Sequence, residues 1–267
     1  MARPRFAALS DGTRSLIDSY AIVYFTGAES AARPHGGVVE TRSVRVLGVT
    51  QAVAGYKAVP GVADELCSIV HGPIIGLAAT SEACPTGAVE NGALRGEGFA
   101  DAAFTESRLA ALLRGPRNFS VLYVGTHFTL RPGNSLLFFL LLGDSSKLTL
   151  DRLSAMDFTG IDLLTISACQ TGLGGAVLED SREVEGLSAL VQRRGAHRVV
   201  ASLWEVEDRS TSKLMRDMYR AIASPRSDVP RALQRAQISL RASGPEGRHP
   251  YEHPYYWAGF VPSDAAP

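Results

Sequence analysis

Apolar runs without polar alternation recur along the chain and are typical of strands buried on both faces of a parallel sheet. These runs occupy residues 44–49, 119–124, 163–166 and 198–204. Apolar residues at spacings of three and four predict helices at 60–70, 105–113, 183–194, 208–222 and 229–240. Because strands alternate with helices between residues 44 and 223, the pattern predicts βαβ units and one mainly parallel, doubly wound α/β sheet.

The remaining segments carry weaker patterns. Residues 20–25 and 136–142 are predicted to be extended, and 150–156 to form a short helix. Residues 76–100 are rich in glycine and alanine and are expected to be irregular. The segment 250–261, which contains two prolines and three consecutive aromatic residues, is expected to close the domain.

A thiol and an imidazole follow two of the predicted strands at corresponding ends. Cys169 comes shortly after the strand at 163–166, before a glycine-rich turn, and His127 follows the strand at 119–124. Open α/β sheets place ligands and reacting groups at the carboxyl ends of their strands. A cysteine hydrolase needs a thiolate nucleophile and an imidazole that carries protons. The alternatives are a buried, unreactive cysteine and a packed or surface histidine.

Composition narrows the functional classes. The 267 residues have a formal net charge of +0, so no basic field indicates binding to nucleic acid. The longest apolar run, residues 136–142, is far shorter than the ~20 residues of a membrane span. We therefore expect no membrane partner and a cytoplasmic location.

The cysteines and histidines give little sign of a bound group. The three cysteines, Cys67, Cys84 and Cys169, are odd in number and have no CxxC spacing, which argues against a disulfide framework and favours a reducing compartment. Pro250 separates His249 from His253, and the glycines at 172–175 lack the spacing of a phosphate-binding loop. We expect neither a metal nor another cofactor.

Several blocks of the chain resemble one known family. Leu-Leu-Thr-Ile-Ser-Ala-Cys-Gln-Thr-Gly-Leu-Gly at 163–174 resembles the nucleophile motif of CHAT domains, a branch of the caspase, separase and gingipain clan of cysteine peptidases. The blocks at 123–127, 185–208 and 255–260 resemble the family in the same way. The resemblance implies a caspase-like three-layer α/β/α sandwich over residues 1–267, without the family's first strand.

The same resemblance implies a cysteine endopeptidase that acts on protein or peptide substrates. Cys169 would attack the scissile carbonyl, His127 would protonate the leaving amine, and the backbone amides of Phe128 and Cys169 would hold the oxyanion. Glycine usually follows the histidine in this family, so the Phe128 side chain is expected to crowd the site. That departure leaves a second hypothesis, a catalytically silent CHAT scaffold. Tetratricopeptide repeats commonly precede a CHAT domain, which implies gating by a regulatory partner.

The segment after the strand at 198–204 is the candidate substrate-binding element. In this clan the substrate pairs with the chain leaving this strand, here from Ser202 through Trp204 to Asp208, in a form of β-augmentation. Trp204 would pack against the substrate. One carboxylate would line the pocket for the P1 residue, with Asp208 as the first candidate and Glu205 as the second, and would favour Arg or Lys there. The alternative is a solvated acidic face with Asp208 as the N-cap of the next helix.

Overall fold

The computed structural model describes most of the chain. The described residues are 8–29, 42–77, 84, 88–89, 91–115, 118–129, 139–170, 182–204, 206–224, 227–244 and 248–266. Only the backbone is described for residues 28–29, 88–89, 168–170, 182–185 and 266.

Strands and helices alternate through the middle of the chain, as the hydrophobic pattern predicts. The strands are β1 (Tyr24–Glu29), β2 (Val44–Gly48), β3 (Val70–Ile75), β4 (Ala88–Val89), β5 (Leu94–Ala100), β6 (Val121–Thr129), β7 (Phe139–Leu141), β8 (Lys147–Thr149), β9 (Leu163–Gln170), β10 (Arg198–Ser202) and β11 (Phe260–Ala266). The helices are α1 (Pro60–Ile69), α2 (Glu106–Arg114), α3 (Leu150–Ser154), α4 (Arg182–Arg193), α5 (Asp208–Ile222) and α6 (Val229–Arg241). Three short 3₁₀ turns lie at Leu16–Asp18, Asp101–Ala103 and Pro254–Tyr256.

The described strands form one eleven-stranded sheet in the order β1-β11-β10-β9-β6-β2-β5-β3-β4, with β7 paired to β6 and β8 paired to β7. From β10 to β3 every neighbouring pair is parallel. After β2 the chain builds β3 and β5 on one side and then returns to add β6, β9 and β10 on the other. The strand order therefore reverses between β2 and β6, which is where open α/β sheets bind ligands.

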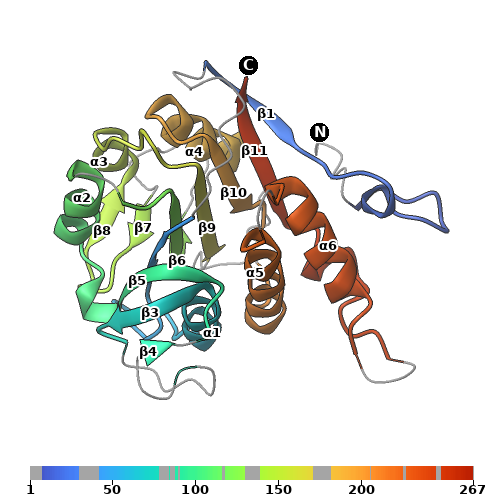
Figure 1. Ribbon diagram of the computed structural model, residues 1–267, viewed down its shortest axis with the longest axis horizontal. Coiled ribbons are helices and arrows are strands. Elements are labelled where there is room, and N and C mark those ends of the chain that lie inside the picture. Colours follow the sequence, from blue (N-terminus) through green and yellow to red (C-terminus); the bar gives the residue numbers. More distant parts are fainter. Residues whose placement is uncertain are drawn as a thin grey trace.

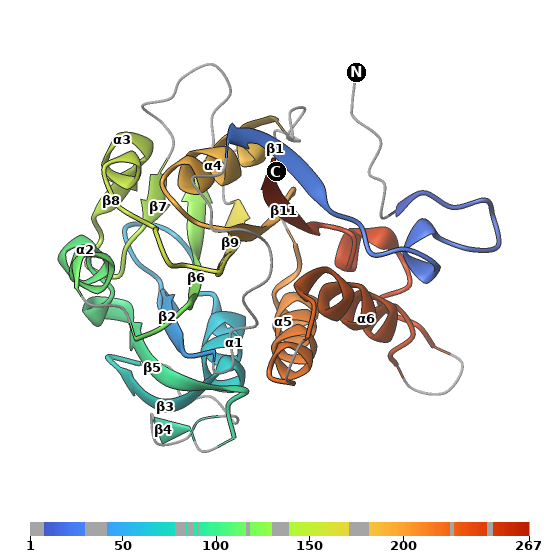
Figure 2. The same cartoon turned by 45° about the horizontal axis from the view of Figure 1, so that its top comes forward.

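Two helical layers cover the two faces of the sheet (Figures 1 and 2). Helices α1, α5 and α6 pack in one core with Tyr123, and α2, α3 and α4 pack in the other core with Leu122. Adjacent residues of β6 point into different cores because side chains alternate along a strand. The predicted α/β/α sandwich with a mainly parallel sheet is confirmed.

Two neighbouring glycines let α1 approach the sheet closely. Gly48 of β2 lies opposite Gly125 of β6, and Val62 of α1 packs over both. A Cβ atom at Gly48 would lie 2.8 Å from Val62 Cγ1, and one at Gly125 would lie 2.9 Å from the same atom. The close approach brings the start of α1 to the carboxyl end of the sheet.

The expectation that residues 76–100 are irregular is wrong for Leu94–Ala100, which form β5 in the interior of the sheet. The glycines that indicated a loop serve close packing instead. A Cβ atom at Gly96 would lie 1.9 Å from the Val44 carbonyl oxygen, and one at Gly98 would lie 2.6 Å from Val46 Cγ2. A strand glycine marks such a close approach as readily as a turn.

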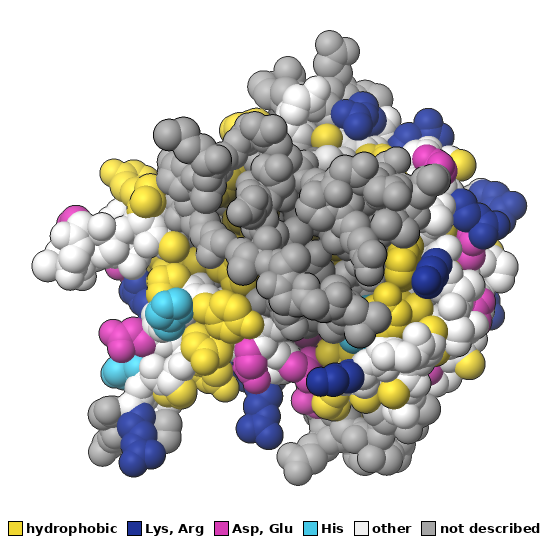
Figure 3. All heavy atoms as spheres, turned by 180° about the vertical axis from the view of Figure 1, so that it is seen from behind, with side chains coloured by type: hydrophobic (Ala, Val, Ile, Leu, Met, Phe, Trp, Pro, Cys, Tyr) yellow, Lys and Arg dark blue, Asp and Glu magenta, His cyan; other side chains and the backbone are white. Residues whose placement is uncertain are grey.

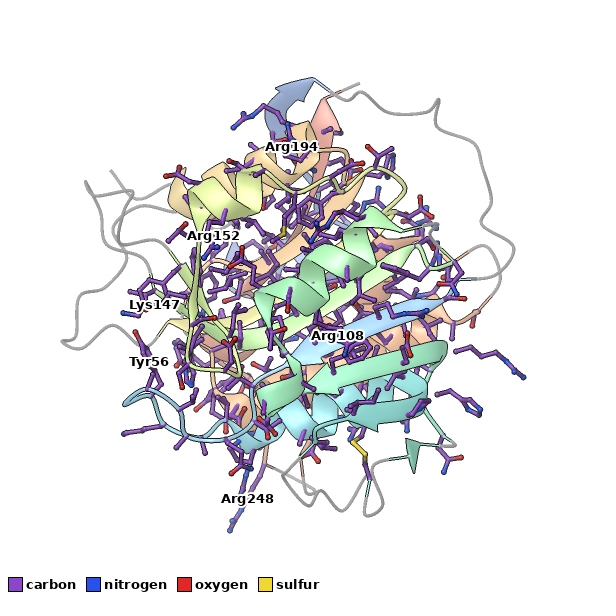
Figure 4. All side chains as sticks on the ribbon, turned by 90° about the vertical axis from the view of Figure 1, so that its left-hand side faces the viewer. Tyr56, Arg108, Lys147, Arg152, Arg194 and Arg248 are labelled. Carbon is purple, nitrogen blue, oxygen red and sulfur yellow. A yellow bond between two sulfur atoms is a disulfide. The ribbon has the colours of Figure 1, made fainter. Side chains whose placement is uncertain are left out.

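The expectation of a chain without disulfide bonds is also wrong. Cys67 of α1 is bonded to Cys84, with their Cα atoms 5.7 Å apart, and the yellow sulfur–sulfur bond is visible in the lower part of Figure 4. The two residues are 17 positions apart in the sequence, so no short motif indicates that they are bonded. Both cysteines are buried against the α1 side of the sheet.

Charged side chains are mixed on the surface. On the face shown in Figure 3, described Lys and Arg side chains are spread around the border, with Asp and Glu side chains among them. The formal net charge of +0 is thus not divided into two separate fields on this face.

One ion pair ties the antiparallel strand β11 to β10. Arg198 Nε and one terminal nitrogen each donate to Asp264 at 2.5 Å, and the two side chains are 17% and 10% exposed. We expect Asp264→Asn to lower the free energy of unfolding by about 2 kcal/mol, because it leaves a mostly buried guanidinium without its bidentate partner. Urea denaturation measures the loss. Glu106→Gln is the control, since its partner Arg152 is 61% exposed and the cost should stay below about 1 kcal/mol. Equal losses in the two variants would contradict the expectation.

Candidate active site

His127 and Cys169 lie directly opposite each other on adjacent strands. β6 and β9 run parallel and pair residue by residue from Val121 with Leu163 to Phe128 with Gln170. In this register His127 pairs with Cys169. Neighbouring strands are ~4.8 Å apart, and paired residues of a parallel ladder project to the same face. The prediction that the two strands are neighbours is confirmed, whereas the Cys169 side chain lies outside the described part of the structure.

The Phe128 side chain points away from this face. It is 6% exposed and packs with Leu122 and Val124 in the core beneath α2, α3 and α4. Strand alternation places His127 on the opposite face, with Tyr123 and α1. The expectation that Phe128 crowds the site is therefore wrong. The assignment of the Phe128 amide to an oxyanion hole stays a prediction.

A backbone carbonyl fixes the His127 ring. Nε2 lies 2.8 Å from the Lys57 carbonyl oxygen, which can only accept, so Nε2 carries a proton and the neutral ring has its lone pair on Nδ1. The imidazole is buried, and burial lowers its pKa. The bond to Lys57 and the negative charge of Asp208 oppose that shift, because both favour the protonated ring.

Lys57 belongs to the loop between β2 and α1, which also places an aromatic ring beside the histidine. The Tyr56 and His127 ring centroids are 5.1 Å apart, and the Tyr56 hydroxyl lies 3.1 Å from Thr129 Oγ1. These contacts were not predicted from the sequence. A carbonyl group is present at every residue, so the Lys57 contact leaves no sequence signal.

Asp208 caps a helix other than its own. The N-cap of α5 is Glu207, whose carboxylate accepts from the Ser210 amide at 2.7 Å. Asp208 Oδ2 instead accepts from the Gly61 amide at 2.8 Å, at the start of α1, where the N-cap residue Val59 makes no side-chain bond. The interpretation of Asp208 as the cap of α5 is wrong, because Glu207 has that role. The Asp208 carboxylate instead binds the amide of Gly61, which is 147 positions away in the sequence.

The Asp208 carboxylate is close enough to the site to influence it electrostatically. Its negative charge raises the pKa values of both His127 and Glu65. Burial raises the pKa of Asp208 itself, with further contributions from Glu207 and Asp64, whereas the Gly61 bond and Arg209 lower it. Of the four predicted substrate-binding residues, Asp208 is thus the one with a described electrostatic link to His127.

The other predicted substrate-binding residues follow β10. Ser202 ends the strand, and its hydroxyl donates to the Trp204 carbonyl oxygen. The Trp204 indole lies against Gly259, and its Nε1 donates to the Tyr255 carbonyl oxygen at 3.0 Å. Glu205 lies outside the described residues.

The ladder between β9 and β10 stops short of the site. It ends where Ile166 pairs with Ala201, whereas β9 continues to Gln170. The pairing of β10 with β11 continues beyond that point, since the Leu203 amide donates to the Gly259 carbonyl oxygen at 2.9 Å. The strand that carries Cys169 therefore extends past its paired neighbour.

A buried glutamate lies beneath the paired strands. Glu65 of α1 is 1% exposed, accepts a hydrogen bond from the Tyr123 hydroxyl, and is hydrogen-bonded to the Ser167 side chain. Tyr123 and Ser167 precede His127 and Cys169 on the same faces of β6 and β9. Burial raises the pKa of Glu65 well above its ordinary value. The sequence signal for this buried carboxyl group was an acidic residue among the apolar residues on the inner face of the helix predicted at 60–70.

Within the described residues, no group of three or more His, Cys, Asp or Glu side chains is placed to hold a metal ion. The search for a helix that is both long and apolar enough to cross a membrane found none among the described residues.

The sheet order and the paired histidine and cysteine strands define an α/β protein with its candidate site at the carboxyl end of the sheet. More particularly, the chain belongs to the CHAT domain family, whose sequence model matches residues 1–265. Comparison with curated proteins gives no match.

Two solved structures show a distant likeness. One is the Arg specific cysteine proteinase gingipain R, with a TM-score of 0.43 and 9% identity over 84% of this chain and 49% of that chain. The other is the complex of Porphyromonas gingivalis RgpB pro- and mature domains, with a TM-score of 0.45 and 10% identity over 91% of this chain and 50% of that chain. The chain thus spans about half the length of each matched chain.

The buried Glu65 carboxyl links stability to pH. The folded chain holds its proton more tightly than the unfolded chain, so stability falls as pH rises from the unfolded pKa toward the raised folded pKa, by at most ~1.4 kcal/mol per pH unit. Gln cannot ionise. We therefore expect Glu65→Gln to be more stable relative to wild type at pH 8 than at pH 5 in urea denaturation. Glu252→Gln removes an exposed carboxylate and is the control. A difference between wild type and Glu65→Gln that is independent of pH would contradict the expectation.

Proposed function

We propose that this chain is a cysteine endopeptidase of the CHAT type, with Cys169 as nucleophile and His127 as acid and base. The observation that carries the proposal is the register of β6 and β9, which pairs these two residues beside an imidazole fixed by the Lys57 carbonyl. Membership of the CHAT family supports the same assignment.

The geometry supports a definite path for the proton. With Nε2 donating to Lys57, the Nδ1 lone pair accepts the Cys169 proton and the thiolate attacks the scissile carbonyl carbon. The backbone amides of Cys169 and Phe128 hold the resulting oxyanion. His127 then donates the proton from Nδ1 to the leaving amine, and the C–N bond breaks. Water hydrolyses the acyl-enzyme with His127 acting as base.

The thiol reactivity tests this proposal. An electrophilic peptide probe and iodoacetamide, which needs no substrate groove, should both label Cys169, as mapped by mass spectrometry. We expect no labelling at this position in Cys169→Ala and a rate lower by ~10²–10⁴-fold in His127→Ala. His71→Ala, which removes an exposed histidine from β3, is the matched control. If His127→Ala and His71→Ala react equally fast, the proposal fails and the silent CHAT scaffold becomes the better account.

We infer that the substrate is a peptide with a basic P1 residue. The end of the β9–β10 ladder supports pairing of an extended peptide between β9 and the segment that begins at Ser202, with Trp204 along its path. The α1 cap uses Asp208 Oδ2, and Oδ1 is the atom that would face an Arg or Lys side chain. A partly buried carboxylate gains most from a charged, hydrogen-bonded partner. Glu205 is the second candidate for this role.

The specificity proposal is tested by the ratio of kcat/KM for Arg over Ala at P1. We expect Asp208→Asn to lower this ratio by ~10²-fold, because the amide keeps an acceptor for the Gly61 amide but loses the charge. Glu207→Gln is the control, since the neighbouring carboxylate caps α5, and Glu205→Gln tests the second candidate. Equal loss for both substrates in Asp208→Asn would mean that the residue serves only as a helix cap.

The same family resemblance supports control by a regulatory partner, such as a module of tetratricopeptide repeats. In that case the isolated chain turns peptides over weakly, and the alkylation experiment is the more direct measure of the site. The P1 profile is then measured with the activated protein.

A further inference from the structure

Asp101, which the proposed chemistry does not use, is a buried carboxylate at the end of β5. It is 7% exposed. Its Oδ1 accepts from the Thr50 amide at 2.7 Å and from the Gln51 amide at 3.1 Å, and its Oδ2 accepts from the Thr50 hydroxyl at 2.8 Å. All of these donors belong to Thr50 and Gln51, the second and third residues of the loop between β2 and α1. The carboxylate therefore anchors the start of that loop to the neighbouring strand.

The backbone around Asp101 is held in an uncommon conformation. Its φ angle is +48°, in the left-handed region. The Phe104 amide donates to the Asp101 carbonyl oxygen at 2.8 Å, and Gly143 approaches so closely that a Cβ atom there would lie 1.6 Å from that oxygen. Asparagine tolerates left-handed backbone as well as aspartate does. The conformation alone therefore does not require a carboxylate. What the carboxylate adds is a negative charge that strengthens the bonds from the converging donors.

Residues near the end of the anchored loop contact His127. The Val59 amide donates to the Thr50 carbonyl oxygen at 3.1 Å and closes the loop, and a tight turn with positive φ at Ala54 (50°) and Gly55 (83°) reverses the chain within it. Tyr56, labelled in Figure 4, extends from this loop, and its ring lies beside His127. The next residue, Lys57, provides the carbonyl that binds His127 Nε2.

We propose that Asp101 is a positioning residue for His127 and acts through the loop at residues 50–59. The proposal rests on the proposed role of His127 as the acid and base of the peptidase. The carboxylate fixes where the loop leaves β2, and the loop fixes the carbonyl that orients the imidazole. Asp101 touches neither substrate nor reacting atoms, so it is not itself catalytic.

Asp101→Asn should loosen this arrangement without changing the size of the side chain. An amide keeps one oxygen for the Thr50 and Gln51 amides, but it loses the negative charge that strengthens these bonds, and its NH₂ group forces the Thr50 hydroxyl to change from donor to acceptor. Displacement of the Lys57 carbonyl removes a bond that raises the pKa of His127, so that pKa should fall. The groups contributed by other elements are kept: Asp208 at the start of α5, and Cys169, which pairs with His127 on β9. Tyr56 lies in the loop itself and moves with Lys57.

The experiment is an NMR titration of His127 in the full chain, which needs no catalysis. We expect a lower His127 pKa in Asp101→Asn than in wild type. Asp11→Asn is the matched control, because Asp11 Oδ1 also accepts from the Thr13 amide, the Thr13 hydroxyl and the Arg14 amide, at 2.7–2.8 Å, but on an exposed turn near the N-terminus. Thr50→Val, which removes only the hydroxyl donor, should shift the His127 pKa in the same direction by less.

Inactivation by the electrophilic peptide probe gives the second measurement. In Asp101→Asn the inactivation rate constant should fall ~10-fold, which corresponds to about one hydrogen bond, with an unchanged binding constant for the probe. An unchanged His127 pKa in Asp101→Asn would overturn the proposal, and Thr50→Val decides it if the first variant does not fold. An unreactive Cys169 in wild type would instead refute the peptidase, and the titration would still test the positioning role.

Discussion

The contact of α1 with the sheet at Gly48 and Gly125 is the constraint on which the site depends. A Cβ atom at either glycine would clash with Val62, so the two glycines allow α1 to lie closer to β2 and β6 than larger residues would. That depth brings Glu65 within reach of the Tyr123 hydroxyl and the helix N-terminus within reach of Asp208. The loop that precedes α1 lies at the end of β6, where the Lys57 carbonyl oxygen binds His127 Nε2.

Three ionisable groups share this small region, two of them buried and the third, Asp208, partly buried, and burial shifts the pKa of each in favour of its neutral form. Glu65 has the least contact with water, and its carboxyl group retains its proton well above the usual range. A protonated Glu65 adds no negative charge beside Asp208, whose own pKa is raised by burial. The charge of Asp208 then favours the protonated state of His127, whereas burial disfavours it. The pKa of His127 is thus set by two opposing effects, its own desolvation, which lowers it, and the neighbouring charge of Asp208, which raises it.

Much of this arrangement could be predicted from the sequence, because apolar runs and helical spacing report burial directly. The positions of His127 and Cys169 at the ends of two such runs were enough to place them together. β5 could not be recognised, since Gly96 and Gly98 give the same local signal whether they form a turn or admit a neighbouring backbone. The Asp208 interaction with α1 and the Lys57 contact both join residues far apart in the chain. The Lys57 contact uses a backbone atom that every residue has. The Asp208 interaction depends on which helices become neighbours.

The position of β11 between β10 and β1 has a consequence for how the chain assembles. Tyr24 near one end pairs with Ser263 near the other, so β1 has no described partner strand until the last strand is in place. Contacts of such long sequence separation form late, because a long loop must close before they contribute. During synthesis the central strands β2, β6 and β9 can associate as they emerge. The edge that bears β1 is completed only when residues 260–266 have left the ribosome, so β9, which carries Cys169, can be in place before this edge is complete.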